Sequence, residues 1–446
     1  MIDYLIIGAD AAGLSAAVQI KRKQSQATIK VISKGRIISY GACGIPYVLS
    51  GDIESADKLI HFTPESFERQ RGIPVEIERE AIALKPKEHQ VQIKNLVTGE
   101  IYTEEYEKLL IGTGAAPTKL PFVDYDMDGI FNLHTIEDLR RVSAFIETKG
   151  PKRAIVIGVG NIGLELIEAL VKLQMEILLF EVRSTPVANW PQAVQKAAQE
   201  KIEEKGIQFI PETAVESVSK TGPSIKIIAG GKEYEADILF SVVGTKPATD
   251  FCRDRLKTLD NGAILVDKKG LTSDKDIYAA GDCATVHHKV LNRSVYWPLG
   301  SAANKMGRIA GLNISGEDIS FPGVVGTQIL KFFELSLAKT GISRAEAEKE
   351  GLDVAHFSAS RPDKAGYYPG AIKATVELTI ETSTEKVIGA NIVCEGSAAS
   401  TIDTAAAAIY SGMSVRDLGW FDSAYAPPYA PVWNALISAA LKASKI

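Results

Sequence analysis

The sequence predicts an α/β protein that contains two parallel-sheet units and a smaller α+β region after them. Two observations lead to this prediction. A pattern of apolar strand, glycine turn, helix and second strand begins at residue 3 and is repeated from residue 153. From Phe321 onward the pattern changes to β-rich segments and an alanine-rich helix. Short apolar strands that alternate with helices are typical of parallel sheets, and a chain of 446 residues has room for roughly two to four domains.

The first unit begins with an apolar strand at residues 3–8, which ends in a glycine. We expect a helix over residues 13–24 and a second strand over residues 28–32. A further strand at residues 109–114 ends in Gly-Thr-Gly and is expected to close the same unit. A strand, a helix and a second strand in this order form a βαβ unit, which starts a parallel sheet.

The second unit repeats this order. A strand is expected at residues 153–158, a helix at 161–173 and another strand at 176–181. A strand at residues 238–244 ends in a glycine turn, and we expect it to return the chain to the first unit.

The C-terminal region is predicted to be of the α+β class. Residues 327–338 and 371–380 are β-rich. Helices are expected over residues 343–350, 398–412 and 431–444. In the first of these, Ser343 and Glu346 have the spacing of a capping box, which predicts that the helix begins after Ser343.

Composition and charge exclude several classes of protein. The formal net charge is −5, which excludes a broadly basic nucleic-acid binder. No run of about 18 apolar residues predicts a membrane span, and Asp3 stands where a signal peptide would carry positive charge. The cysteines are too few and too scattered for a disulfide scaffold or a zinc site; they are Cys43, Cys252, Cys283 and Cys394. We therefore expect a cytoplasmic enzyme.

The second unit carries the clearer ligand motif, which consists of Gly158, Val159, Gly160, Asn161, Ile162 and Gly163. It follows a strand and opens a helix, and Glu181 stands at the end of the next strand. Such glycines allow a pyrophosphate to approach the helix N-terminus, and the carboxylate suits a ribose with free hydroxyls. A glycine-rich structural turn is the alternative. The position of the motif favours a dinucleotide site.

The first unit carries an altered form of this motif, which consists of Gly8, Ala9, Asp10, Ala11, Ala12 and Gly13. Asp10 replaces the middle glycine, and Ser33 and Lys34 follow the strand where an acidic ribose ligand is expected. Farther along, a strand ends in Gly281 and Asp282, which can aim a carboxylate at a sugar or ribityl hydroxyl. The alternative for Asp282 is a helix N-cap. Two such sites in one chain imply electron transfer between two cofactors.

In the order of its motifs, the chain resembles the FAD-dependent pyridine nucleotide–disulfide oxidoreductases. The shared order is the first glycine motif, Gly112-Thr113-Gly114, the second glycine motif, Gly244, and then Gly281 with Asp282. The resemblance covers nearly the whole chain. It implies two Rossmann-like dinucleotide-binding domains of the three-layer ββα type and an α+β dimerisation domain. The implied bounds are 1–115 with 246–320 for FAD, 116–245 for NAD(P)H, and 321–446 for the interface.

The resemblance implies that Cys43 is the redox centre. Relatives with an internal disulfide carry two cysteines in a CxxxxC pattern, whereas no second cysteine lies near Cys43. Cys43 is therefore expected to act alone, through a mixed disulfide, a persulfide or a sulfenic acid. Its place at a helix start predicts a lowered thiol pKa. The other three cysteines are expected to be buried and inert.

Single-cysteine relatives differ in their proton donor. Those that reduce peroxide or oxygen carry a histidine at the position of Ala11, whereas coenzyme A disulfide reductases use tyrosines. The segments around Cys43, 366–370 and 424–433 resemble those of the coenzyme A disulfide reductases. The candidate catalytic tyrosines are Tyr367, Tyr368 and, above all, Tyr425, and Tyr429 is a candidate substrate ligand. The alternative is a rigid aromatic dimer contact.

Three further groups of residues complete the expected site. Gly300, Ser301 and Ala302 begin a helix whose N-terminus faces the flavin in relatives, where its partial positive charge stabilises an anion. Ser39 is expected to contact the substrate. Arg22, with its basic neighbours Lys21 and Lys23, would hold coenzyme A phosphates, unless it is simply a solvated helix end. The six histidines show no ligand spacing.

We therefore expect a homodimeric flavoprotein that reduces coenzyme A disulfide, a coenzyme A persulfide or polysulfide. Its cofactors would be FAD and NADH, with NADPH possible, and coenzyme A would form a mixed disulfide with Cys43. NADH is preferred because Glu181 would repel a 2′-phosphate, although Arg183 lies nearby. An NADH oxidase or peroxidase that uses a Cys43 sulfenate is one alternative, which Ala11 disfavours. A flavin redox sensor or electron-transfer component is the other. Neither a nucleic-acid partner nor a membrane span is expected.

Overall fold

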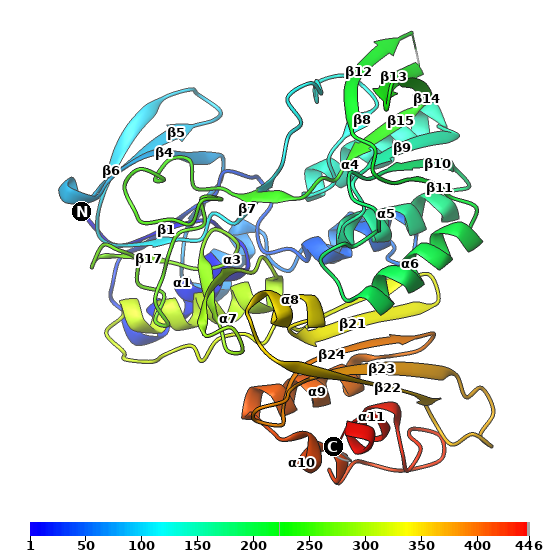
Figure 1. The fold of residues 1–446 in the computed structure, drawn as a ribbon. Helices are drawn as coiled ribbons and strands as arrows, with labels where there is room; N and C mark the ends of the chain where they lie inside the picture. The colour runs from blue at the N-terminus through cyan, green and yellow to red at the C-terminus, as the bar shows by residue number, and fades with distance from the viewer. Residues whose placement is uncertain (223, 444–446) are drawn as a thin grey trace.

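The structure is a computed structural model that describes residues 1–222 and 224–443. Two α/β units lie side by side, and a C-terminal domain lies below them in the view of Figure 1. The first unit, at the left, combines the blue N-terminal strands with the lime-coloured helix α7 (Gly300–Ile314). The second unit, at the upper right, is teal to green. The predicted α/β class, with an α+β domain after the two units, is confirmed.

The first unit is built on a mixed sheet. Strand β1 lies between β2 and β6 in parallel, and β17 pairs in parallel with β6. Strands β4 and β5 extend the same sheet as an antiparallel meander that the sequence did not predict. The strands are β1 (Ile2–Ile7), β2 (Ile29–Ile32), β3 (Val75–Glu76), β4 (Arg79–Lys85), β5 (Gln90–Asn95), β6 (Ile101–Ile111) and β17 (Ile277–Ala279). The helices besides α7 are α1 (Ala11–Lys23) and α3 (Pro64–Arg71).

Helices α1 and α7 touch backbone to backbone. A Cβ added to Gly307 would lie 2.2 Å from the carbonyl oxygen of Ala12, and one added to Gly311 would lie 2.6 Å from Cα of Ala16. Only glycine permits this approach. Because the contacts advance in the same direction along both helices, both helix N-termini lie at the same end of the unit.

The second unit repeats the parallel order around β9. Its sheet runs β11–β10–β9–β15–β8, with all neighbours parallel. The strands are β8 (Ile130–Phe131), β9 (Arg153–Ile157), β10 (Glu176–Phe180), β11 (Gln208–Ile210) and β15 (Ile238–Ser241). The helices are α4 (Ile136–Lys149), α5 (Asn161–Lys172) and α6 (Gln192–Glu204). An antiparallel sheet that the sequence did not predict consists of β12 (Val215–Thr221), β13 (Ser224–Ala229) and β14 (Lys232–Ala236).

The C-terminal domain contains an antiparallel sheet in the order β20–β21–β24–β23–β22. The strands are β20 (Gln328–Phe332), β21 (Leu335–Gly341), β22 (Val354–Pro362), β23 (Lys373–Glu381) and β24 (Lys386–Cys394). The helices are α8 (Arg344–Lys349), α9 (Ala399–Ser411), α10 (Val415–Gly419) and α11 (Ala435–Ala443). The capping box of Ser343 and Glu346 is confirmed. The last helix begins later than residue 431, and residue 444 lies outside the described part of the chain.

Two short strands pair where the chain passes between the α/β units. They are β7 (Ala115–Pro117) and β16 (Thr245–Pro247), which run antiparallel. This pairing supports our proposed division into 1–115 with 246–320, 116–245, and 321–446. The remaining elements are β18 (Thr285–His288), β19 (Arg293–Tyr296), α2 (Ile45–Leu49) and the 3₁₀ turns Ala42–Gly44, Ala56–Leu59 and Pro86–Glu88. Among the described residues, no helix has the length and apolar character needed to cross a membrane.

Candidate active site

Cys43 lies in a short turn that is attached to the first glycine motif. The backbone N–H of Ser39 donates to Ala9 O at 3.0 Å. The backbone N–H of Tyr40 donates to Asp10 Oδ1 at 3.2 Å. Cys43 follows within the 3₁₀ turn Ala42–Gly44, immediately before α2, and is an exposed free cysteine. The other three cysteines are buried, as expected.

The lowered pKa predicted for Cys43 is wrong for the protein chain. Although part of the residue is exposed, enough protein surrounds the sulfur for burial to raise the pKa of the thiol. The carboxylates of Glu165, Asp282 and Asp10 raise this pKa further. Helix α2 has only five residues and starts after Cys43, so its dipole is small beside three nearby negative charges.

The first glycine turn is closed by direct backbone contacts. A Cβ added to Gly8 would lie 2.0 Å from Gly112 O, and one added to Gly13 would lie 1.8 Å from Gly8 O. Gly8 also has a φ of +112°, which side-chain-bearing residues rarely adopt. The glycines therefore bring the end of β6 and the start of α1 into contact.

Two carboxyl groups near this turn, those of Asp10 and Asp282, have no ion-pair partner among the described residues. Burial raises the pKa of Asp10 and that of Asp282 to about 6. Asp282 Oδ1 is buried and has no hydrogen-bond partner within the described residues. Thr113 Oγ1 is also buried, beside the Cys283 thiol. A buried oxygen without a partner is costly, so this site fits a ligand that donates hydroxyl hydrogen bonds, such as the ribityl chain of a flavin.

The second glycine turn has the same closed ends and an open middle. A Cβ on Gly158 would lie 2.7 Å from Val242 O, and one on Gly163 would lie 2.5 Å from Gly158 O. A Cβ on Gly160 would meet no atom within 4 Å. The chain itself therefore does not require glycine at this position, and the free space suits a bound pyrophosphate.

Glu181 is fixed at the second glycine turn, where the sequence predicted it. Its two oxygens accept the backbone N–H groups of Val159 and Arg183, each at 3.0 Å. Asn161 Oδ1 accepts Trp190 Nε1–H at 2.9 Å, so this side chain is held by the loop after β10. The carboxylate keeps lone pairs for further hydrogen-bond donors, which would suit the hydroxyls of a ribose.

The remaining residues that the sequence predicted to bind cofactor or substrate differ in their exposure and in their partners. Ser33 is buried, while Lys34 forms an ion pair with Glu80 at 2.7 Å. Gly244 is open to added atoms. Gly300 and Ser301, at the start of α7, and Arg22, at the end of α1, are exposed, and Ala302 is buried. Arg22 therefore lies exposed between two lysines that have partners of their own, since Lys21 Nζ donates to Ser25 O at 2.8 Å and Lys23 forms an ion pair with Glu317.

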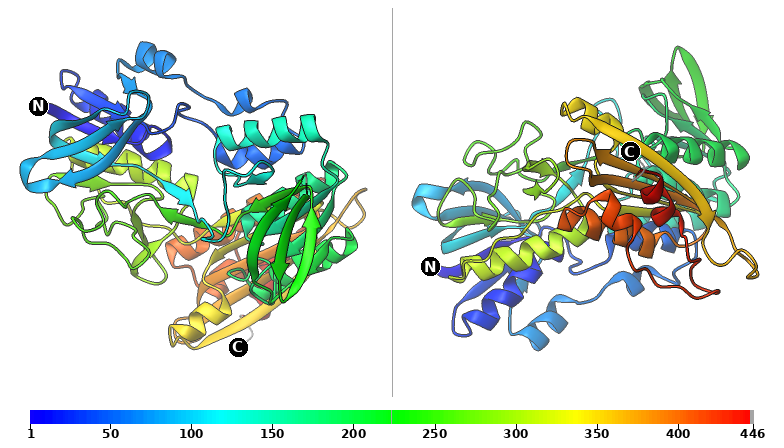
Figure 2. Two further views of the ribbon diagram at one scale, coloured as in Figure 1. Left: turned by 90° about the horizontal axis from the view of Figure 1, so that it is seen from above. Right: turned by 60° about the horizontal axis from the view of Figure 1, so that its bottom comes forward.

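The candidate tyrosines gather in the C-terminal domain. The hydroxyls of Tyr367 and Tyr425 lie 3.3 Å apart, and the loops that carry them, orange and red, run together at the lower right of Figure 1. Figure 2 shows both loops at the edge of the molecule. In the single chain the tyrosines stay solvent-accessible, with exposed fractions of 76% for Tyr367, 40% for Tyr368, 51% for Tyr425 and 84% for Tyr429.

Two residues near Cys43, Tyr47 in the chain and Glu165 in the fold, were not predicted from the sequence. Tyr47 follows Cys43 by one helical turn, and its hydroxyl donates to Glu165 Oε1 at 3.2 Å. Glu165 lies on α5, two residues after Gly163. Their proximity depends on the packing of α2 against α5, which joins the two units and leaves no signal in either motif.

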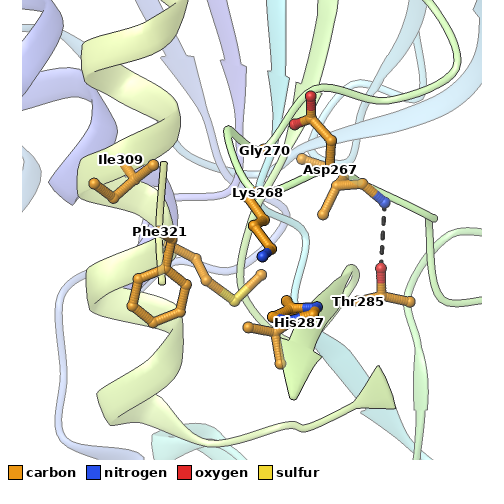
Figure 3. Close-up of a pocket in the computed structure, with 11 residues that line it drawn as sticks. Asp267, Lys268, Gly270, Thr285, His287, Ile309 and Phe321 are labelled. Atoms are coloured by element: carbon orange, nitrogen blue, oxygen red, sulfur yellow. Dashed lines mark hydrogen bonds between the residues drawn. The ribbon is translucent and has the colours of Figure 1, made fainter. Parts of the chain in front are cut away.

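A small cavity of about 20 Å³ lies elsewhere in the first unit, next to α7 (Figure 3). Met306, Ile309, Phe321 and His287 are among the residues that line it, and on one side of it Val266 N–H donates to Thr285 Oγ1 at 3.2 Å. This volume holds about one water molecule, so the cavity is too small for a cofactor. In the described part of the chain, no group of three or more metal-ligating side chains occurs.

Known proteins that are similar over nearly the whole chain include several oxidoreductases that act with NAD(P)H or NAD, as their names state. The chain is 35% identical, over 97% of both chains, to an "NAD(P)H sulfur oxidoreductase (CoA-dependent)" of Pyrococcus furiosus. It is 29% identical, over 96% of both chains, to a "Coenzyme A disulfide reductase" of Staphylococcus haemolyticus. An "NADH oxidase" of Methanocaldococcus jannaschii is 30% identical over 99% of this chain and 98% of its own. The solved structure of an NAD-dependent persulfide reductase from A. fulgidus superimposes with a TM-score of 0.94 at 34% identity, covering 100% of this chain and 83% of that one.

Two family matches cover most of the sequence. Residues 2–307, which include both glycine turns and Cys43, match the pyridine nucleotide-disulphide oxidoreductases. Residues 327–436, which include all four candidate tyrosines, match the dimerisation domain of the same family. The chain belongs to the pyridine nucleotide-disulphide oxidoreductase family.

Proposed function

We propose that this protein reduces coenzyme A disulfide or a coenzyme A persulfide or polysulfide at the expense of NAD(P)H. One observation carries the proposal: a single accessible cysteine, Cys43, is attached to the first glycine turn, and every other cysteine is buried. A lone accessible sulfur beside a flavin site can hold half of a disulfide substrate as a mixed disulfide. The relatives whose names include coenzyme A or persulfide support this choice of substrate.

The cofactors are FAD and NAD(P)H. FAD would be held by the turn Gly8–Gly13, by Thr113 and Gly114, and by Asp282, whose unpartnered oxygen fits a ribityl hydroxyl. The nicotinamide nucleotide would be held by the turn Gly158–Gly163 and Glu181. When bound, FAD supplies a two-electron carrier between the nicotinamide and the sulfur. The net reaction converts NAD(P)H, one proton and a disulfide into NAD(P)⁺ and two thiols.

We further propose that the active protein is a homodimer in which Tyr425 acts on Cys43 of the other subunit. The match of residues 327–436 to a dimerisation domain supports the dimer. Several large aromatic side chains of this domain are exposed, including Trp420, Tyr429 and Trp433 at 71%, 84% and 49%. Exposed rigid aromatics are typical of interface centres. Tyr425 would donate a proton to the departing thiolate, and Tyr367 would orient its hydroxyl.

Intact-mass analysis of the protein purified without reductant tests the substrate proposal. We expect an adduct with the mass of coenzyme A on Cys43 and none on the Cys43→Ser variant. Cys43→Ser should keep FAD and its reduction by NADH but lose about 1,000-fold or more in coenzyme A disulfide turnover. Near-normal turnover of Cys43→Ser would refute the proposal.

Mixed dimers test the shared site. Tyr425→Phe should lower disulfide turnover at least about tenfold while NADH still reduces the flavin. Co-expression of Cys43→Ser with Tyr425→Phe should restore part of the activity, because each mixed dimer keeps one intact site. If mixed dimers form and no activity returns, Tyr425 does not act across the interface.

The NADH oxidase alternative is favoured only by the relatives of that name. Ala11, at the start of α1, offers no proton donor beside Cys43. Oxygen consumption measured with NADH, with and without coenzyme A disulfide, separates the two functions. Rapid oxygen consumption that coenzyme A disulfide leaves unchanged would favour the oxidase.

A further inference from the structure

A lysine of the C-terminal domain contacts both α/β units at one point. Lys339 lies on β21, in the sheet that packs against α5 and α6 of the second unit (Figure 1). Its ammonium group donates to Asn189 O at 2.9 Å and lies over the Trp190 ring, 5.2 Å from the ring centroid. Both residues belong to the loop 187–190, between β10 and α6. The ammonium group also lies 5.9 Å from the ring centroid of Trp297, which comes shortly before α7 of the first unit.

The loop 187–190 is bound in turn to the second glycine turn. Val187 N–H donates to Val159 O at 2.8 Å. Trp190 Nε1–H donates to Asn161 Oδ1 at 2.9 Å. Both acceptors belong to the turn whose open centre suits the pyrophosphate of a dinucleotide. A shift of the loop would therefore break these hydrogen bonds or move the turn, including the side chain of Asn161 at the start of α5.

The backbone of this loop is strained and depends on its contacts. Val187 has a φ of +43°, in the left-handed region that a β-branched residue rarely adopts. Such a conformation persists only where the surrounding structure maintains it. The side-chain amide of Gln195 donates to the carbonyls on both sides of Asn189, at 3.2 and 2.6 Å. The carbonyl of Asn189 itself accepts from Lys339, so the C-terminal domain supplies one of the contacts that maintain the loop.

The charge of Lys339 is stabilised without a carboxylate partner. In the part of the chain that the structure describes, no aspartate or glutamate lies within ion-pair distance of it, and burial lowers its pKa although the charge of Glu346 opposes this. Aromatic faces and a carbonyl oxygen are the groups that stabilise such an ammonium. Lys205 joins the same two regions at the far end of α6 and differs in this respect. It lies 4.8 Å from the ring centroid of Phe333 and also forms an ion pair with Glu334 at 2.9 Å.

We propose that Lys339 is a positioning residue for NAD(P)H. It holds the loop 187–190 against the second glycine turn and so raises the affinity of that turn for the nucleotide from outside the nucleotide-binding unit. Trp297 supports the lysine from the first unit, so the loop is fixed relative to both cofactor turns. The inference rests on the proposed nucleotide site, and it holds whichever acceptor the flavin reduces.

A merely structural role for Lys339 predicts a different result. If Lys339 only attaches the C-terminal domain to the second unit, its loss lowers the melting temperature and leaves nucleotide affinity unchanged. If Lys339 positions the loop, its loss lowers nucleotide affinity, and this effect requires the hydrogen bond from Trp190 to Asn161. Trp190→Phe keeps a ring for the ammonium group and removes the Nε1 donor. Loss of Lys339 should therefore add little to the effect of Trp190→Phe.

The test measures the Kd of NAD⁺ for the oxidised holoenzyme by isothermal titration calorimetry, and KM and kcat for NADH by steady-state kinetics. Lys339→Met keeps most of the apolar side chain and removes the charge and the donor. We expect it to raise the Kd of NAD⁺ and the KM for NADH about fivefold and to leave kcat at saturating NADH unchanged. Lys339→Arg keeps a cation that can lie over both rings and should recover most of the affinity. Lys205→Met is the matched control and should leave both constants unchanged.

The double variant completes the test. Trp190→Phe should raise the Kd of NAD⁺ about threefold, and the addition of Lys339→Met should raise it less than about twofold further. An unchanged Kd in Lys339→Met, an equal rise in Lys205→Met, or independent effects in the double variant would overturn the positioning role.

Two further results keep this inference separate from the proposed function. An unchanged Kd of NAD⁺ in Glu181→Ala overturns the nucleotide site and the positioning role together. Failure to reduce coenzyme A disulfide overturns the proposed substrate, whereas a weaker binding of NAD⁺ to Lys339→Met still supports the positioning role. FAD content and thermal unfolding confirm that each variant is folded. If Lys339→Met does not fold, Lys339→Gln, which keeps a donor for Asn189 O but no charge, is judged by the same Kd.

Discussion

The two glycine turns share one framework and differ at its centre. In both turns, the first and last glycines are required because an added Cβ would meet a backbone carbonyl within 2.7 Å. The middle position is Gly160 in the second turn, with open space around it, and Asp10 in the first. The side chain of Asp10 accepts the N–H of Tyr40 and so holds the segment that leads to Cys43.

This difference shows how one framework serves two tasks. The second turn leaves its centre free, and its carboxylate, Glu181, comes from the neighbouring strand. The first turn has its carboxylate, Asp10, within the motif, and this carboxylate holds the segment that leads to Cys43. Departure from the glycine pattern therefore marks an added structural connection and does not imply loss of the ligand site.

The comparison is tested most strongly by adding one methyl group to each turn. Gly8→Ala should prevent the first unit from folding or binding FAD, because the Cβ would lie 2.0 Å from Gly112 O at a φ of +112°. Gly160→Ala should fold and bind FAD but raise the KM for NADH about tenfold. FAD content, thermal unfolding and steady-state kinetics measure both effects. Equal stability of Gly8→Ala and Gly160→Ala would contradict the conclusion that backbone contacts require glycine at position 8 but not at position 160.

The sequence predicted the framework because each part of it is local. The strand and the helix that flank each of the turns Gly8–Gly13 and Gly158–Gly163 are recognised from residues next to the turn. Glu181 stands directly after the strand that follows the second turn. The pairing of Tyr47 with Glu165 could not be predicted, because it depends on how α2 packs against another unit. The raised pKa of Cys43 was missed for the same reason: Glu165 and Asp282 approach it from distant parts of the chain.

The carboxylate of the second turn, Glu181, is expected to determine both the affinity for the nucleotide and the choice between NADH and NADPH. Glu181→Ala should lower kcat/KM for NADH about 10- to 100-fold and reduce the preference for NADH over NADPH, because the ribose ligand and the repulsion of a 2′-phosphate are both lost. Glu176→Gln, at the opposite end of β10, is the matched control and should change neither value. An unchanged ratio of the two kcat/KM values would show that Arg183 governs the choice of nucleotide.

A smaller effect is expected on the stability of the FAD-free protein. The folded-state pKa of Asp282 is about 6, above the ordinary value, so between about pH 4 and pH 6 the folded chain binds more protons than the unfolded chain. The contribution of Asp282 to stability is therefore full below about pH 4 and is lost as the pH rises through 6. Asp282→Asn should raise the free energy of unfolding at pH 7.5 by about 1–2 kcal/mol relative to pH 4.5, compared with wild type. Urea unfolding at both pH values measures this difference, and parallel pH dependence of the two proteins would contradict it.

The smallest expected effect comes from Asp10, the residue that distinguishes the two turns. Asp10→Asn keeps an oxygen that can accept the Tyr40 N–H and removes one negative charge near Cys43. The Cys43 pKa should therefore fall by about half a pH unit. This is less than the fall expected in Asp282→Asn, because the charge of Asp282 acts on the thiol more strongly than that of Asp10.

The variant Asp10→Gly instead restores the glycine of the motif and removes both the charge and the hydrogen-bond acceptor. The pH dependence of iodoacetamide reaction at Cys43 gives the pKa in each holoenzyme variant. If Asp10 also positions the segment, Asp10→Gly loses at least about threefold more disulfide turnover than Asp10→Asn despite a similar thiol pKa. Equal turnover in the two variants would mean that the hydrogen bond to Tyr40 contributes nothing, and that the first turn differs from the second only in charge.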